Sequence, residues 1–150
     1  MPVPGSSQIQ FPSTLSADFN VDQVTDPGGA PANVLDLDQG FAVSGHIDFP
    51  NWLSGTATVS VYADQRGGGY DQEILSTNIT LTANPSDPPS LTTTNWTLTY
   101  PTDLPSTSAP LTDPSPPPGS MVYDLTATFT FNGVPSDIAA FVDMGPYMIN

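Results

Sequence analysis

Apolar and polar residues alternate one by one along several segments of the chain. In the clearest case, residues 121–132, Met121, Leu125 and Phe129 fall on one face, with Asp124 and Thr126 on the other. A side-chain period of two with one apolar face predicts a half-buried antiparallel strand. Such alternation predicts strands at 34–38, 41–49, 56–64, 73–83, 93–100, 121–132 and 138–149, with an additional one at 17–24.

Turn-forming residues separate these segments. Eighteen Pro and twelve Gly interrupt nearly every window that is long enough for a helix. The sequence at 66–69 is rich in Gly, and Asn-Gly at 132–133 stands between two apolar runs, which predicts a terminal hairpin over 121–149. Seven or eight strands at a spacing of about 8–12 residues predict an all-β sandwich or barrel.

The first 33 residues differ from the rest. Residues 1–33 hold five Pro among Ser, Gly and Gln, which predicts an extended arm before a sandwich domain at 34–150. The arm also carries large apolar side chains, which would dock on a neighbouring subunit and drive assembly, or along an edge of their own sandwich. The assembly residues predicted in this way are Ile9, Phe11, Leu15 and Phe19.

The strand at 121–132 carries Tyr123, Leu125 and Ala127 in the pattern Tyr-x-Leu-x-Ala. This pattern resembles strand F of immunoglobulin-like and fibronectin type III-like sandwiches, in which the Tyr hydroxyl bonds back to the preceding corner. The resemblance implies an immunoglobulin-like antiparallel β-sandwich of seven to eight strands with an extended N-terminal arm. The chain has no Cys, so it lacks the disulfide of a true immunoglobulin domain. Sandwiches of this kind serve as adhesins, chaperones, capsid decorations and carbohydrate binders.

The charge balance excludes several classes of partner. Arg66 is the one Lys or Arg against fifteen Asp and Glu, and the formal net charge is −14. Nucleic-acid phosphates and anionic lipid headgroups would be repelled by such a chain. No apolar run approaches the ~20 residues of a membrane span. We therefore expect no nucleic-acid or membrane partner.

The surface composition points to an exposed location. Charged residues make up 11% of the chain against a typical ~25%, so Thr, Ser, Asn and Gln must cover the outside. Uncharged polar coats of this kind are common on extracellular and virion surface modules. The N-terminus lacks the positive and apolar regions of a signal peptide. We therefore expect an extracellular or virion-surface protein, with cytoplasmic synthesis before assembly as one route.

No set of residues predicts catalysis. His46 is the only His, and it lies on the polar face of 41–49 between Ser44 and Asp48. A catalytic triad needs a His as its base, but a lone strand His is typically a surface residue. No Gly-x-Ser-x-Gly motif accompanies it. We predict no catalytic residue and no enzymatic activity.

Calcium is the one metal that the acidic residues favour. Asp36 and Asp38 share one face of a predicted strand, ~7 Å apart. Asp64, Asp71 and Glu73 flank the Gly-rich loop 65–70, whose carbonyl oxygens could complete an oxygen cage. The chain has no EF-hand spacing, and we predict no cofactor other than this candidate calcium.

These observations favour a non-catalytic structural or protein-interaction module of an extracellular or virion-type assembly. Such a module would self-associate as a homo-oligomer or bind a host protein of the assembly. The alternative is a carbohydrate-binding or adhesive module, stabilised by calcium, that stacks sugar rings on Trp52 and Tyr70. Self-association separates the two, because a lectin of this size would bind glycans as a monomer.

Overall fold

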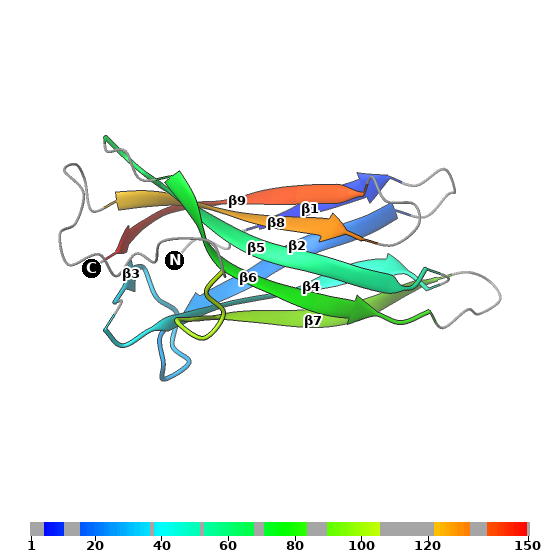
Figure 1. Ribbon diagram of the computed structural model, residues 1–150, viewed down its shortest axis with the longest axis horizontal. Helices are drawn as coiled ribbons and strands as arrows, with labels where there is room; N and C mark the ends of the chain where they lie inside the picture. The colour runs from blue at the N-terminus through cyan, green and yellow to red at the C-terminus, as the bar shows by residue number, and fades with distance from the viewer. Residues whose placement is uncertain are drawn as a thin grey trace.

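Two β-sheets pack face to face in the computed structural model of the protein (Figure 1). The structure describes residues 5–10, 16–36, 38–51, 53–67, 71–83, 90–105, 122–132 and 138–149. The four-stranded sheet has the order β1-β2-β4-β7, and the five-stranded sheet has the order β3-β9-β8-β5-β6. The strands are β1 (Gly5–Gln10), β2 (Ser16–Thr25), β3 (Val34–Leu35), β4 (Phe41–Pro50), β5 (Gly55–Gln65), β6 (Asp71–Leu81), β7 (Leu91–Tyr100), β8 (Val122–Phe131) and β9 (Ala139–Ile149).

The all-β sandwich predicted from the alternation is confirmed. Paired strands run antiparallel, except that β3 runs parallel to β9. The strand predicted at 34–38 is shorter than expected, because β3 ends at Leu35 and a turn follows. In that turn the Asp36 carbonyl accepts a hydrogen bond from the Gly40 N–H over 2.8 Å. Asp36 and Asp38 therefore do not share the face of a strand.

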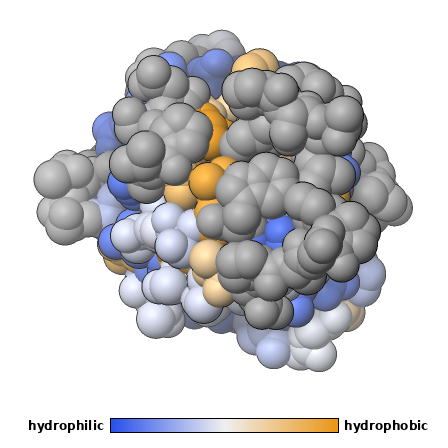
Figure 2. Space-filling model, turned by 90° about the vertical axis from the view of Figure 1, so that its right-hand side faces the viewer, coloured by the Kyte–Doolittle hydropathy of each residue, from blue (hydrophilic) through white to orange (hydrophobic). Residues whose placement is uncertain are grey.

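The core lies between the two sheets and contains the inward-facing residue of each alternating pair. Phe129 of β8 packs against Phe19 of β2 and Phe49 of β4, with ring centroids 5.7 Å and 5.9 Å away. Apolar surface is also visible near the middle of one end of the molecule (Figure 2). The alternation places nine core residues together, and all are buried in one cluster: Phe41, Ile47, Val59, Val61, Trp96, Leu98, Tyr123, Leu125 and Phe129.

The N-terminal segment does not form a separate arm where the structure describes it. β1 pairs with β2, and β2 pairs with β4, so both strands belong to the four-stranded sheet. Phe19 is 0% exposed and stacks on Trp96 with ring centroids 5.5 Å apart. It is a core residue and offers no free surface for assembly. This is the intramolecular docking that the sequence left as the alternative.

The other predicted assembly residues are only partly described. Ile9 lies in β1 opposite Ala17, and its side chain is outside the described residues. Phe11 and Leu15 also lie outside them. Their part in assembly stays a prediction.

A β-bulge in β2 changes which residues face the core. The register with β4 shifts between Val21 and Gln23, which leaves Asp22 as the extra residue. As a result Val21 and Val24 are both buried, while Asp22 and Gln23 are both exposed. Bulges commonly re-aim a side chain in this way. Here the bulge turns Asp22 onto the outer face of the sheet, beside β4.

Candidate functional site

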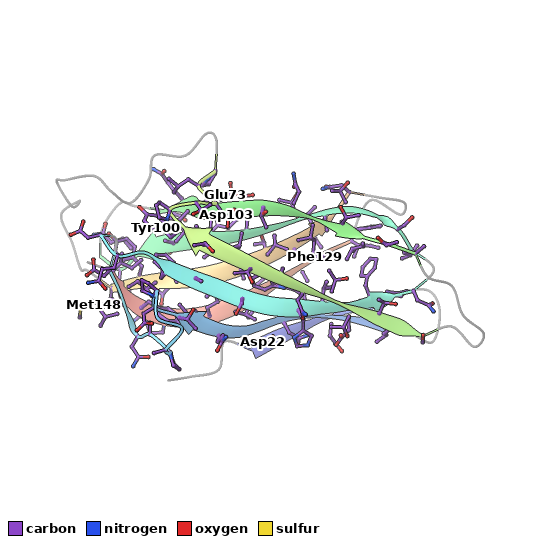
Figure 3. The ribbon with its side chains drawn as sticks, turned by 90° about the horizontal axis from the view of Figure 1, so that it is seen from below. Asp22, Glu73, Tyr100, Asp103, Phe129 and Met148 are labelled. Carbon is purple, nitrogen blue, oxygen red and sulfur yellow. The ribbon has the colours of Figure 1, made fainter. Side chains whose placement is uncertain are left out.

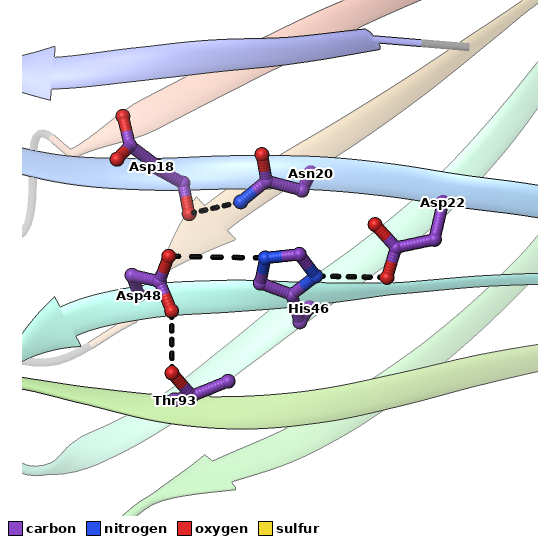
Figure 4. Close-up of polar contacts among 6 residues, drawn as sticks. All are labelled: Asp18, Asn20, Asp22, His46, Asp48 and Thr93. Atoms are coloured by element: carbon purple, nitrogen blue, oxygen red, sulfur yellow. Dashed lines mark hydrogen bonds and ion pairs between the residues drawn. The ribbon is translucent and has the colours of Figure 1, made fainter. Parts of the chain in front are cut away.

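The outer face of the four-stranded sheet carries an imidazole between two carboxylates (Figure 4). Asp22 Oδ2 lies 2.8 Å from Nδ1 of His46, and Asp48 Oδ2 lies 3.8 Å from its Nε2. The Thr93 hydroxyl donates to Asp48 Oδ1 over 2.5 Å. Contacts therefore run from β2 across β4 to β7 on this face.

This geometry does not form a nucleophilic triad. In a triad one imidazole nitrogen faces a hydroxyl or thiol, and the other faces a carboxylate. Both nitrogens of His46 face carboxylates instead, and the nearby Thr93 hydroxyl is directed to Asp48. The ring thus contacts carboxylates of two neighbouring strands, β2 and β4. Sequence reasoning identified His46 and Asp48 as neighbours but missed Asp22, whose position depends on the bulge.

The chain's one guanidinium is also used to link strands. Arg66 follows β5 and donates two hydrogen bonds to Asp124 of β8, of 2.9 Å from Nε and 2.8 Å from Nη2. These hydrogen bonds and the charge of Asp124 raise the pKa of Arg66. His46 and Arg66 are thus both engaged by carboxylates of adjacent strands.

The five acidic residues predicted as calcium ligands lie in two places. Asp36 Oδ1 accepts a hydrogen bond from the Asp38 N–H over 2.9 Å, so the Asp36 carboxylate stabilises the turn. Asp64 and Asp71 lie directly opposite each other on β5 and β6. Among the described residues, no three His, Cys, Asp or Glu side chains come together in a way that could hold a metal ion. Calcium binding stays a prediction.

Glu73 lies on β6 opposite Tyr62 of β5, two positions along from the Asp64–Asp71 pair. Burial, followed by the charge of Glu73 and a hydrogen bond with it, raises the pKa of Tyr62. Glu73 thus already has a hydrogen-bond partner in Tyr62.

Raising the ionic strength should raise the melting temperature, because salt screens the repulsion among fifteen acids. Melting curves in NaCl and in CaCl₂ of matched ionic strength then test for calcium. If calcium binds, the melting temperature should rise more in CaCl₂ than in NaCl, and the Asp71→Asn variant should lose this difference. Identical melting curves in the two salts would show that the calcium prediction is wrong.

The predicted sugar-stacking residues, Trp52 and Tyr70, lie outside the described residues. The most exposed large apolar side chain among the described residues is Phe141, 69% exposed on the outer face of β9. Val34 and Met148 are also exposed and lie opposite each other on β3 and β9. Exposed apolar side chains on a sheet face are typical of contact surfaces when they gather.

β7 forms one edge of the four-stranded sheet and pairs with β4 along its whole length without a register shift. The Thr99 N–H donates to Asp103 Oδ2 over 2.8 Å, and the Thr99 carbonyl accepts the Asp103 N–H over 2.8 Å. The polar backbone groups of Thr99 thus point away from β4. Because these groups alternate in direction along a strand, the same outward direction holds for Leu91, Thr93, Asn95 and Thr97.

We call Leu91, Thr93, Asn95 and Thr97 the open edge of β7. In the part of the chain that the structure describes, no strand pairs with β7 on this side, and no loop backbone bonds to these four residues. Their side chains are exposed and uncharged. Most natural edge strands are short or carry a Lys, a Pro or a bulge that prevents further pairing. β7 has none of these devices over its ten residues.

A comparison of the chain with protein-family models and with curated proteins finds no match in either. Among the described residues, no helix has the length and apolar character needed to cross a membrane.

Proposed function

We propose that the protein is a non-catalytic structural or protein-interaction module of an extracellular or virion-type assembly. It would dock its partners by strand pairing at the edges of the four-stranded sheet. The observation that carries this proposal is the open edge of β7, because this strand has ten residues and none of the usual protective residues. An exposed edge of this kind is a template on which an added strand forms main-chain hydrogen bonds.

The second edge of the same sheet supports the proposal. β1, with the sequence GSSQIQ, also has no charged residue and no Pro. Exposed apolar side chains on the other sheet, Phe141 above all, add contact surface. The uncharged polar coat and the single site for trypsin-like proteases, at Arg66, suit an exposed location.

The contacts of His46 support the non-catalytic part of the proposal. Both nitrogens of its ring face carboxylates, so the imidazole links strands and is not directed at a nucleophile.

We also infer that the sandwich is immunoglobulin-like. In that fold, strands A, B and E are neighbours in one sheet, and C, F and G in the other, to which variable-type domains add C′. The four-stranded sheet contains the order β2-β4-β7, which fits A-B-E. The five-stranded sheet contains the order β6-β5-β8-β9, which fits C′-C-F-G. Tyr123 then lies on strand F, as the Tyr-x-Leu-x-Ala pattern implies.

Placing a Lys on both edges should abolish association. Ser6→Lys with Asn95→Lys introduces charge at β1 and β7, whereas Ser44→Lys with Thr126→Lys introduces the same charge on interior strands. In sedimentation velocity, the wild type and the interior variant should form species heavier than the 15.7 kDa monomer. The edge variant should sediment as a monomer. An edge variant that associates like the wild type would contradict the proposal, whereas a wild type that stays monomeric at every soluble concentration would restrict it to docking of a host protein.

A further inference from the structure

We propose that the open edge of β7 pairs antiparallel with the open edge of β7 in a second copy of this chain. The two four-stranded sheets would then form one continuous eight-stranded sheet across a two-fold axis. This inference rests on the proposed function and names both the site and the partner.

The hydrogen-bonding groups of the open edge match themselves. With Thr94 at the centre of symmetry, Leu91 faces Thr97 of the partner subunit, and Thr93 faces Asn95 of the partner subunit. Every outward N–H and C=O on one copy then meets its complement on the other. Such a register forms about eight backbone hydrogen bonds, two in each hydrogen-bonded pair.

Charge explains why a second copy would dock here. Each copy carries a net charge of −14, so most approaches of two copies are repulsive. β7 contains no charged residue from Leu91 to Tyr100. In the self-paired register its outer face would place Thr beside Asn and Leu beside Thr. Like charges directly opposite each other destabilise a strand pair, and this register contains none.

The other edges of the described sheets are less suitable. β6 starts with Asp71 and contains Glu73, and its register with β5 is irregular at Val61 and Tyr62. β3 has two residues, and β1 has six. β7 is thus the longest regular and uncharged edge in the described part of the chain.

Asp103 sets the length of the pairing. It occupies the backbone groups of Thr99, and its own carbonyl accepts the Ser76 N–H of β6 over 2.9 Å. Asp103 lies at the end of β7, near Tyr100 and Glu73 (Figure 3). A carboxylate at this position prevents pairing beyond Thr97. The open edge therefore ends in both copies at the same residues, which favours one symmetric register.

Amide hydrogen exchange measured by NMR tests this register directly in the wild type. The N–H groups of Thr93, Asn95 and Thr97 should exchange rapidly at low protein concentration and become protected as the concentration rises. Those of Thr92, Thr94 and Trp96 point to β4 and should be protected at every concentration. Concentration-dependent protection that appears in β1 and not in β7 would overturn the inference.

An isosteric pair of variants provides the second test. Asn20 and Asn95 both lie opposite His46, Asn20 on interior strand β2 and Asn95 on the open edge. Asn95→Asp should raise the dimer dissociation constant about tenfold or more, because the new carboxylate of each copy then faces Thr93 of the partner subunit, and Thr93 is itself bonded to the carboxylate of Asp48. Asn20→Asp adds the same charge beside the same ring and should change the constant less than about twofold.

The outcomes separate this inference from the proposed function. Association that survives Asn95→Asp but is lost in Ser6→Lys would overturn pairing through β7 and leave edge docking standing. Absence of self-association at every concentration would overturn this inference and restrict the proposed function to docking of a host protein. Circular dichroism of each variant checks that the sandwich remains folded.

Discussion

Replacing Gly45 with Ala should destabilise the protein by about 3 kcal/mol, the upper range for overpacking, or prevent it from folding. Gly45 lies in the middle of β4, between β2 and β7. A Cβ at this position would overlap the Asn20 carbonyl oxygen and lie 2.5 Å from Cζ2 of Trp96. The obstacle on one side is backbone, which cannot move without breaking the ladder between β2 and β4.

The close approach at Gly45 has a structural cause. Trp96 of β7 is buried and stacks on Phe19 of β2, so its indole must cross the inner face of β4. The space that it crosses is the space where a side chain of residue 45 would lie. Gly45 is therefore needed for room, and its backbone is not in the left-handed region.

Equilibrium denaturation measures this loss, with Gly28→Ala as the matched control. Gly28 is exposed, and a Cβ there would meet only Asp26 Oδ1, at an ordinary 3.4 Å. The control should change the free energy of unfolding by less than about 1 kcal/mol. If the two variants lose equal stability, Trp96 does not pack across β4 as described.

Local alternation was enough to predict most of the strands. In β8, Tyr123, Leu125, Ala127 and Phe129 all face the core, as the period of two requires. The alternation succeeds because one face of nearly every strand meets the opposite sheet, so burial follows directly from side-chain direction. The turn at Asp36 was missed because Asp can bond its own backbone and end a strand within one residue.

The N-terminal segment was misjudged because its Pro content outweighed its apolar pattern. Ala17, Phe19 and Val21 alternate, and the next apolar residue, Val24, comes three positions later. That change of spacing from two to three is the sequence signal of the bulge at Asp22. With the bulge included, the segment has a continuous apolar face, and the proximity of Asp22 to His46 follows.

The candidate docking site could not be predicted from local pattern at all. The uncharged run from Leu91 to Tyr100 is visible in the sequence, but strand order decides whether it lies inside a sheet or at its edge. Strand order depends on contacts between distant segments, such as the pairing of β4 with β7. The positions of the five predicted calcium ligands depend on strand order in the same way. This explains why the sequence could predict them as ligands although they do not form a metal site among the described residues.

Replacing Phe129 with Ala should lower the free energy of unfolding by about 3–5 kcal/mol, because it removes a buried aromatic ring that joins the two sheets. The Phe129 ring is fully buried and packs on Phe19 and Phe49, both from the opposite sheet. Aromatic pairs of this kind add about 0.5–1.5 kcal/mol beyond the area that they bury. No neighbouring strand can move inward to refill the space without breaking its own ladder.

Thr128→Ala is the matched control for Phe129→Ala, because Thr128 is the adjacent residue on the outer face of β8. This variant should lower the free energy of unfolding by less than about 1 kcal/mol, because it changes only strand propensity and local contacts. Urea denaturation followed by tryptophan fluorescence measures the free energy of unfolding of both variants, since Trp96 stacks on Phe19 within the same cluster. Equal losses at residues 128 and 129 would mean that β8 does not face the other sheet. The sandwich, and with it the position of β7 as an open edge, would then have to be revised.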